Sequence, residues 1–487
     1  MSSSTTPDRK WLALALLAAA QFVVVLDASI VNVALPSIGR ELQFAQDDLS
    51  WVINAYTLTF GGFLLLGGRM ADLLGRRRLF LSGLILFAVA SLAGGLAQNA
   101  GQLIAARAVQ GLGGALLSPA ALSLVTVMFT EGADRNKAFG VWGAVAGSGG
   151  AVGVLLGGML TEWAGWEWVL FVNVPIALVA AALAPRLLPE SRNGGARHFD
   201  VAGAVSITAG LSLLVYALID ATNAGWGSAR TLGLIAIALA LIAGFVAIER
   251  SSRAPLMPFP GIFRIRTISG INLTALFIAM ALFSMFFFVS LYMQQVLGFD
   301  ALEAGLAYLP LALGIIVSAG VASQLTTRFG FKPVLIVGLL LTAGGLTWFS
   351  QVSPSGSYVG DVLFPSLLAA VGLGFAFVPM TIAAVSGVDG HEAGLASGLI
   401  NTSQQIGGAL GLAILATIAN GRTGDVAAAG EPLPVALTEG FQRAFTVGAA
   451  FAIVGALVAT FLISSRASRE HAEAAQRGEI EPVPVAA

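Results

Sequence analysis

Long apolar runs separated by short polar segments dominate the chain. Scanned with a window of about 19 residues, it contains fourteen stretches long enough to cross a hydrocarbon core of about 30 Å as helices. They are 11–35, 49–69, 79–97, 103–129, 138–160, 166–188, 201–220, 231–249, 268–295, 303–324, 334–350, 360–384, 394–419 and 441–463. Because lipid offers backbone groups no hydrogen-bond partner, each stretch must be an α-helix. We therefore predict an all-α polytopic membrane protein with fourteen transmembrane helices.

The composition supports this class of protein and excludes several others. Of the 487 residues 57% are hydrophobic and 10% are charged, whereas soluble domains carry about 25% charged residues. The absence of cysteine excludes disulfides and thiolate chemistry, and the three histidines are far apart in the sequence. We therefore expect no metal, no cofactor and no nucleic-acid partner. The polar segment after residue 463 has few bulky apolar residues, so we predict that it is disordered.

The distribution of cations predicts how the chain is oriented. With a cytoplasmic N-terminus, 20 of the 25 lysine and arginine residues fall on the inner side, four fall outside and Arg107 lies within a helix. Cytoplasmic loops of membrane proteins carry such an excess of positive charge. We therefore expect both termini to be cytoplasmic.

Three short motifs occur twice, in the same order and at nearly the same offset. GRRRLFLSGLILF from Gly75 is similar to GFKPVLIVGLLLT from Gly330, GLGGALLSP from Gly111 to GLGFAFVPM from Gly372, and GGAVG from Gly149 to GGALG from Gly407. This repetition predicts two six-helix halves with an inserted helix pair between them, a design found in transporters. The predicted divisions are a first bundle at 1–190, a linker and inserted pair at 191–266, a second bundle at 267–463 and a cytoplasmic tail at 464–487.

Several motifs resemble those of the major facilitator superfamily, specifically its fourteen-helix drug:proton antiporter branch. The resemblance rests on LDASIVNVALP in the first helix, GGRMADLLGRRR between helices 2 and 3, LIAARAVQGLGGALLSPA in helix 4 and GGAVGVLLGG in helix 5. It covers essentially the whole chain and implies the major facilitator fold. Two positions depart from the family pattern: Val154 replaces a proline in helix 5, and Thr327 stands in the second half where Asp72 stands in the first.

One carboxylate, Asp27, lies in the middle of the first apolar run. It follows Lys10 by about 25 Å of helix, and Arg107 lies near the outer end of helix 4, so the two residues can share a depth. Burial opposes ionisation of an acid and a nearby guanidinium favours it. We expect Asp27, with Arg107, to be reached by water from alternating sides and to alternate between proton and substrate. The alternative is a fixed ion pair that joins helices 1 and 4.

The loop between helices 2 and 3 suggests a gate. Gly68, Asp72 and Gly75 bracket a tight turn, and the arginines from Arg76 to Arg78 keep it on the cytoplasmic side. The resemblance implies that Asp72 and Arg76, with Arg77 beside them, hold the inner gate shut while the cavity is open to the outside. The alternative is that the arginines only set topology.

Helix 5 carries a row of glycines. Gly149, Gly153 and Gly157 recur every four residues, with Gly158 beside the last, and such a face lets another helix approach closely. It would permit sliding or tight closure between the halves, although plain packing explains it equally well. Val154 leaves the expected proline hinge in doubt.

Polar residues within the apolar helices are candidates for the lining of a substrate cavity, although hydrogen bonds between helices explain each of them equally. The candidates are Asn32, Tyr56, Gln110, Asn272, Tyr292, Gln295, Asn401 and Gln405.

Together these patterns predict a transporter that exports small amphipathic compounds in exchange for protons by alternating access. The alternatives are nutrient uptake and export of an endogenous lipid or metabolite. The short loops and the lack of a catalytic motif argue against an enzyme. We expect the partners to be a small-molecule substrate, protons and the lipid bilayer, and the protein to be a monomer. Three lysines against 22 arginines suggest a GC-rich bacterial genome, and hence the bacterial cytoplasmic membrane.

Overall fold

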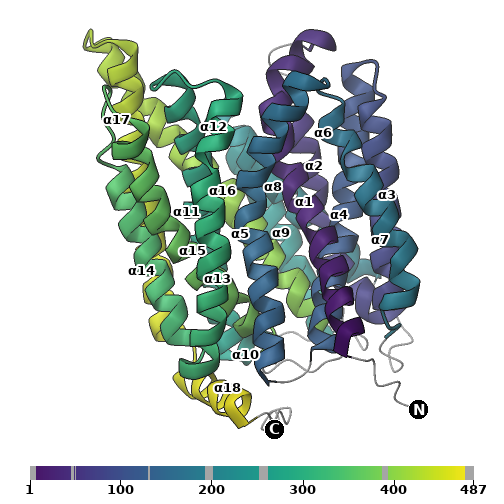
Figure 1. The fold of residues 1–487 in the computed structure, drawn as a ribbon. Helices are drawn as coiled ribbons and strands as arrows, with labels where there is room; N and C mark the ends of the chain where they lie inside the picture. Colours follow the sequence, from purple (N-terminus) through teal and green to yellow (C-terminus); the bar gives the residue numbers. More distant parts are fainter. Residues whose placement is uncertain are drawn as a thin grey trace.

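The chain forms a set of long helices that cross the molecule from one end to the other (Figure 1). This computed structural model describes residues 7–44, 49, 51–129, 132–191, 201–251, 261–386 and 393–477, and within those ranges there is no β-strand. Twelve of the described helices are long and apolar enough to cross a membrane, and the bent helix α5 becomes the thirteenth if it is one span. The stretch 201–220 coincides with α8, whose apolar part, Ala202–Leu218, is shorter. The predicted all-α fold is confirmed.

The helices form a first bundle, an inserted pair and a second bundle. The first bundle contains α1 (Pro7–Glu41), α2 (Trp51–Leu74), α3 (Arg76–Gly95), α4 (Ala100–Met128), α5 (Gly132–Trp163), α6 (Trp168–Phe171) and α7 (Asn173–Leu187). The inserted pair is α8 (Val201–Ala224) and α9 (Ala229–Ser251). The second bundle contains α10 (Gly261–Arg264), α11 (Arg266–Gln295), α12 (Ala301–Ala307), α13 (Leu309–Phe329), α14 (Phe331–Phe349), the π-helix η1 (Tyr358–Leu363), α15 (Phe364–Ala384), α16 (Ala393–Ala428) and α17 (Leu433–Leu462). Both predicted connections around the inserted pair fall largely on residues 192–200 and 252–260, outside the described residues.

The two bundles repeat one packing scheme. In the first, α3 and α2 pack on α4 and α1 packs on α5; in the second, α14 and α13 pack on α15 and α11 packs on α16. One glycine on each central helix allows the same close approach: a Cβ on Gly113 of α4 would lie 2.7 Å from the backbone nitrogen of Phe87 on α3, and one on Gly372 of α15 would lie 2.4 Å from that of Thr342 on α14. The repeated motifs therefore mark equivalent helices, although their alignment pairs Gly372 with Gly111 rather than with Gly113.

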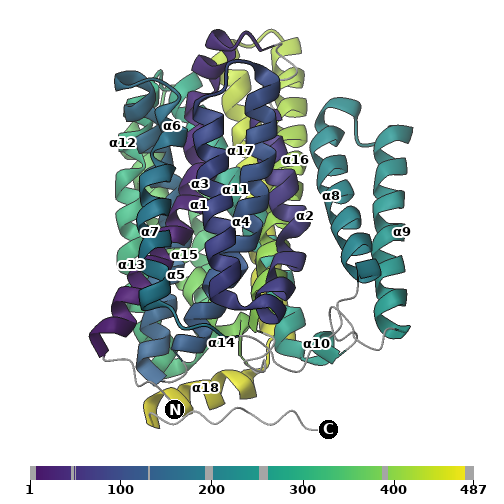
Figure 2. The same cartoon turned by 90° about the vertical axis from the view of Figure 1, so that its right-hand side faces the viewer.

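Contacts between the bundles follow the same symmetry. The second helix of the first bundle, α2, packs on α16, and α13 of the second bundle packs on α5. The inserted pair stands at the side, where α8 contacts α2 and α16 and pairs with α9 (Figure 2). Many large apolar side chains point outward, including Val317 at 68% and Phe461 at 70% exposure. Lipid is the environment that makes such surfaces stable.

The start of α1 and helix α18 lie at one end of the molecule, the lower end in Figure 1, which we call the terminal end. There the structure corrects the prediction of a disordered tail, because residues 465–477 form the helix α18 (Ser465–Arg477). Its buried face consists of small residues, Ser468, Ala472 and Ala475, and packs on α5, α13 and α14. The sequence did not predict this helix because the segment contains few bulky apolar residues. Residues 478–487 lie outside the described residues.

Helix α5 bends by 44° between Asp134–Gly150 and Val152–Trp163. The bend lies in a glycine-rich stretch and needs no proline, since glycine and serine pairs also kink helices. A bend is therefore present although Val154 replaces the proline of the family motif.

Candidate functional site

The structure brings Asp27 and Arg107 together as an ion pair. Asp27 lies on α1 and Arg107 on α4, and the guanidinium Nη1 donates to Asp27 Oδ2 at 2.5 Å. The Nε of Arg107 donates to the backbone oxygen of Val52 on α2 at 3.0 Å, and the guanidinium lies 4.4 Å from the centre of the Tyr56 ring. The cation is thus held by a carboxylate, a carbonyl and an aromatic face, which together offset its desolvation.

Amides complete the shell around the carboxylate. Asp27 Oδ1 accepts from Gln110 Nε2 at 2.8 Å and from Asn173 Nδ2 at 2.7 Å. Both amides also donate to the hydroxyl of Ser91, which donates to the carbonyl of Leu170. Four helices, α1, α3, α4 and α7, therefore meet at one acid. The sequence prediction missed Ser91 and Asn173. A serine or asparagine within an apolar helix does not reveal from the sequence alone which group its side chain bonds.

This network is shielded from water. Asp27, Gln110, Ser91 and Asn173 have no exposed surface, and Arg107 is 1% exposed. The expectation that water reaches Asp27 is therefore not met in this conformation, because the helices of the first bundle pack around it. Proton access to Asp27 requires those helices to rearrange.

A second buried ion pair lies where α2 ends and α3 begins. Arg76 donates to Asp72 Oδ1 through Nη2 at 2.7 Å and Nε at 3.2 Å, and both residues are buried. The other carboxylate oxygen of Asp72 accepts from the backbone nitrogen of Leu395 at 3.1 Å, in the first turn of α16. Helix N-termini favour a negative charge. One carboxylate thus joins both bundles at the terminal end, beside the contact between Gly68 and Gly398.

Glu190 was not predicted, yet it holds this turn in place. Its Oε1 accepts from the backbone nitrogen of Arg77 at 3.2 Å, and its Oε2 lies 3.7 Å from Arg77 Nε and 3.8 Å from Arg78 Nε. Gly75 has a φ of 110°, and a Cβ there would lie 2.6 Å from the Glu190 carboxylate. The turn therefore requires glycine for its conformation and for space.

The second bundle makes the equivalent contact without a charge. Thr327, at the position that corresponds to Asp72, accepts a hydrogen bond at its Oγ1 from Asn136 Nδ2 on α5 at 2.6 Å. Helix α18 covers this contact: His471 Nε2 lies 3.2 Å from Asn136 Oδ1, and Gln476 donates to the carbonyls of Thr327 and Arg328. Burial, and to a smaller extent the nearby Arg135, lowers the pKa of His471 to about 4. His471 is therefore neutral at neutral pH.

The glycine face of α5 serves packing within the first bundle. A Cβ on Gly149, Gly153 or Gly157 would collide with α1, and for Gly153 it would lie 2.9 Å from the Leu26 carbonyl oxygen. Gly158 is also buried. The glycine row therefore faces α1 of its own bundle rather than the second bundle. The contacts of α5 with the second bundle involve Gly140 and Gly143 instead, against Ser323 and Val378.

The candidate cavity residues do not gather in one place. Tyr56 and Gln110 belong to the Asp27 network. Tyr292 donates to the carbonyl of Ser353, and Gln295 is exposed at the end of α11. Asn32 is exposed and donates to the carbonyl of Ala28. The other three lie on or against α16: Asn272 accepts from Ser403, Asn401 donates to the carbonyl of Ser397, and Gln405 lies near Gly61.

Two repeated bundles of membrane-spanning helices, with a buried ion pair inside one and polar contacts between them, define a secondary transporter. Comparison with known proteins gives the family: the profile of the Major Facilitator Superfamily matches residues 17–412. The chain belongs to this superfamily.

Relatives and solved structures agree with this assignment. The chain is 41% identical to the puromycin resistance protein pur8 of Streptomyces alboniger, over 94% of this chain and 93% of that protein. It is 42% identical to the cephamycin export protein CmcT of Amycolatopsis lactamdurans, over 84% and 85%. The human organic anion transporter MFSD10 superposes with a TM-score of 0.65 at 15% identity, over 93% of this chain and all of that one. A double-tryptophan variant of XylE superposes with a TM-score of 0.66 at 12% identity, over 96% and 99%.

Proposed function

We propose that the protein exports small amphipathic compounds, such as antibiotics and dyes, in exchange for protons across a bacterial cytoplasmic membrane. The fold supports transport rather than catalysis. Relatives named for puromycin resistance and for cephamycin export, which match most of the chain, support export and this substrate class. A monomer is sufficient, since one chain contains both bundles.

The buried pair of Asp27 and Arg107 is the observation that carries proton coupling. A proton on Asp27 would neutralise the carboxylate and leave the Arg107 guanidinium buried without a counter-charge. Breaking a buried pair in this way costs about 3–5 kcal/mol. Protonation would therefore favour a conformation in which Arg107 reaches water or another anion, and this requires α4 to move against α1.

We propose that the terminal end is cytoplasmic. The loop arginines Arg76, Arg77 and Arg78 lie there, as the positive-inside rule expects. Asp72 with Leu395, and Asn136 with Thr327, would then form a closed inner gate. The substrate cavity would open to the outside when these contacts hold and to the cytoplasm when they break.

Accumulation in cells tests this function. A drug-sensitive bacterium that expresses the protein should accumulate less ethidium and survive more puromycin than one that expresses Asp27→Asn at the same level. Collapse of the proton gradient with a protonophore should abolish the difference. Equal accumulation with and without the protein would contradict drug export and favour an endogenous lipid or metabolite as cargo, and raised accumulation would indicate uptake.

A further inference from the structure

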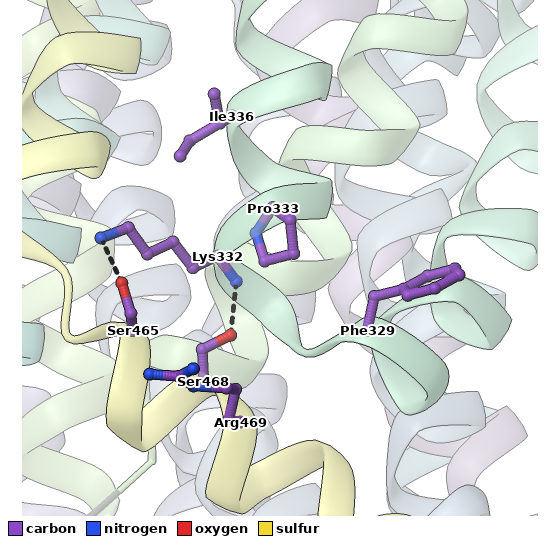
Figure 3. A pocket seen from close by; sticks show the side chains of 7 residues that line it. All are labelled: Phe329, Lys332, Pro333, Ile336, Ser465, Ser468 and Arg469. Atoms are coloured by element: carbon purple, nitrogen blue, oxygen red, sulfur yellow. Dashed lines mark hydrogen bonds between the residues drawn. The ribbon is translucent and has the colours of Figure 1, made fainter.

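A pocket of about 440 Å³ opens between α18 and the start of α14 (Figure 3). It lies at the terminal end, and none of the residues that line it belongs to the Asp27 network. Its lining consists of Phe329, Lys332, Pro333, Ile336, Ser465, Ser468 and Arg469. Two cations and two hydroxyls thus share the pocket with apolar side chains.

The charge of the pocket is positive. The ammonium of Lys332 donates to the carbonyl of Ile463 at 2.8 Å and to Ser465 Oγ at 2.9 Å, which leaves one of its three protons for a ligand. Arg469 is exposed and has no hydrogen-bond or ion-pair partner among the described residues. Arg266 on α11 is close enough to act electrostatically on Lys332. No carboxylate lines the pocket. The site therefore suits an anion with several acceptor oxygens.

The depth of the pocket points to a lipid. The span of α14 begins at Phe331 and that of α17 ends at Leu462, so the pocket lies at the level of the headgroups. Phe329, which lines the pocket, is 53% exposed. Val337 follows the lining residue Ile336 and is 46% exposed, and Phe461, two residues before the Lys332 acceptor Ile463, is 70% exposed. A phosphate held in the pocket can thus carry acyl chains along this surface.

We propose that this pocket binds the phosphodiester of an anionic phospholipid from the leaflet at the terminal end. Inorganic phosphate carries a similar anionic group, but only a lipid would also cover the apolar surface beside the pocket. Bound lipid would bridge α14 and α18, and so hold α18 against both bundles. This site is independent of the transported substrate and of the proposed function.

Native mass spectrometry of the full chain in detergent, titrated with dioleoylphosphatidylglycerol, tests the proposal. Arg469→Gln should weaken binding about fivefold, which corresponds to about 1 kcal/mol for one cation at the membrane surface. Arg469→Glu should weaken it further. Arg466→Gln is the matched control, because Arg466 lies on the same helix but outside the pocket and pairs with Glu470 at 2.6 Å. It should bind the lipid as the wild type does.

Three outcomes would overturn the proposal. Equal losses in Arg466→Gln and Arg469→Gln would mean that general surface charge attracts the lipid. Equal binding of dioleoylphosphatidylcholine would remove the need for an anionic headgroup. Displacement of the lipid by inorganic phosphate at similar concentration would mean that the pocket recognises the free anion and that the apolar surface contributes nothing.

Discussion

At the scale of single residues, the buried charges decide what the protein can do. Asp27 receives one guanidinium and two amide donors, so its negative charge is fully compensated inside the membrane. Asp72 is satisfied by Arg76 and by the first turn of α16. The first acid lies within one bundle and the second between the two, so we expect a change at each to affect a different step of transport.

Asp27→Asn should destabilise the protein because it leaves Arg107 buried without its counter-charge, at a cost of about 3–5 kcal/mol. The double variant Asp27→Asn with Arg107→Gln has no buried charge there and should regain most of this stability. Thermal unfolding in detergent, followed by tryptophan fluorescence, measures both. Proton-coupled transport should stay absent in the double variant. If it returned, the pair would be only a structural link.

The shared membrane depth of Asp27 and Arg107 could be predicted from the sequence, but the other partners of Asp27 could not. Counting residues along helices 1 and 4 placed Asp27 and Arg107 at one level. Gln110 was assigned to the cavity instead, and Asn173 was missed. Hydropathy does not fix the rotation of a membrane helix, because its lipid-facing and bundle-facing sides are both apolar. Contacts such as Tyr292 with Ser353 depend on that rotation.

At the scale of helices, two features shape the contacts between elements: the glycine face of α5 and the amphipathic helix α18. The glycines of α5 were recognised as a contact face, but the helix that they contact depends on the fold. Helix α18 was missed because alanine and serine, rather than bulky residues, form its buried face. It reaches α5 of one bundle and α13 and α14 of the other.

Gly153→Ala should lower the melting temperature, since its Cβ would lie 1.8 Å from Ser29 Oγ and 2.9 Å from the Leu26 carbonyl oxygen. Overpacking of this kind costs about 1–3 kcal/mol. Gly150→Ala is the control on the same helix, because its nearest neighbour is Phe286 at 3.9 Å. Equal melting temperatures for the two variants would contradict the assignment of this face to α1.

Acid should weaken the docking of α18. A released His471 titrates near its usual pKa of 6.5, whereas the docked residue, buried near Arg135 and packed on the Phe331 ring, has a pKa of about 4. Between pH 4 and 6.5, His471 therefore binds a proton when α18 is released but not when it is docked. The equilibrium constant for docking is therefore largest above pH 6.5 and falls about tenfold per pH unit between 6.5 and about 4.

Hydrogen exchange of residues 465–477, corrected for intrinsic rates, should therefore be about tenfold faster at pH 5.5 than at pH 7.5. His471→Asn keeps a polar group beside Asn136 but does not titrate, so it should remove this dependence. The same pH response in the variant would place the titrating group elsewhere.

At the scale of the whole molecule, we propose that the contacts at the terminal end set the balance between conformations. Asp72→Ala removes the ion pair with Arg76 and the acceptor for Leu395. Charged hydrogen bonds of this kind contribute about 1.5–3 kcal/mol, so the population open at the terminal end should rise about tenfold or more. The chain has no cysteine, and a cysteine at Ser323, buried against Gly140, reports this opening.

Labelling of Ser323→Cys by a maleimide should therefore be faster in the Asp72→Ala background. Arg78→Gln is the control: Arg78 is 70% exposed and lies 3.8 Å from Glu190, so its loss should leave the rate unchanged. If Asp72→Ala labelled no faster than Arg78→Gln, the contact with α16 would have no role in the gate.

The repeated motifs allowed the bundle architecture and the inserted pair to be predicted, because they mark equivalent helices in the two bundles. The exit route of the substrate could not be predicted, since it depends on which contacts between the bundles break.

The membrane potential limits the substrate gradient that proton-coupled export can reach. One proton that moves through 100 mV supplies about 2.3 kcal/mol, enough for a gradient of about 40-fold. Exchange for one monovalent cation moves no net charge, so only the pH gradient drives it.

Ethidium flux in proteoliposomes with an imposed pH gradient is the most direct test of proton-coupled export through Asp27. The wild type should concentrate ethidium on the acidic side and release protons to the other side. Asp27→Asn should still bind ethidium but should not concentrate it. Full gradient-driven flux in Asp27→Asn, or no response of the wild type to the pH gradient, would contradict the account.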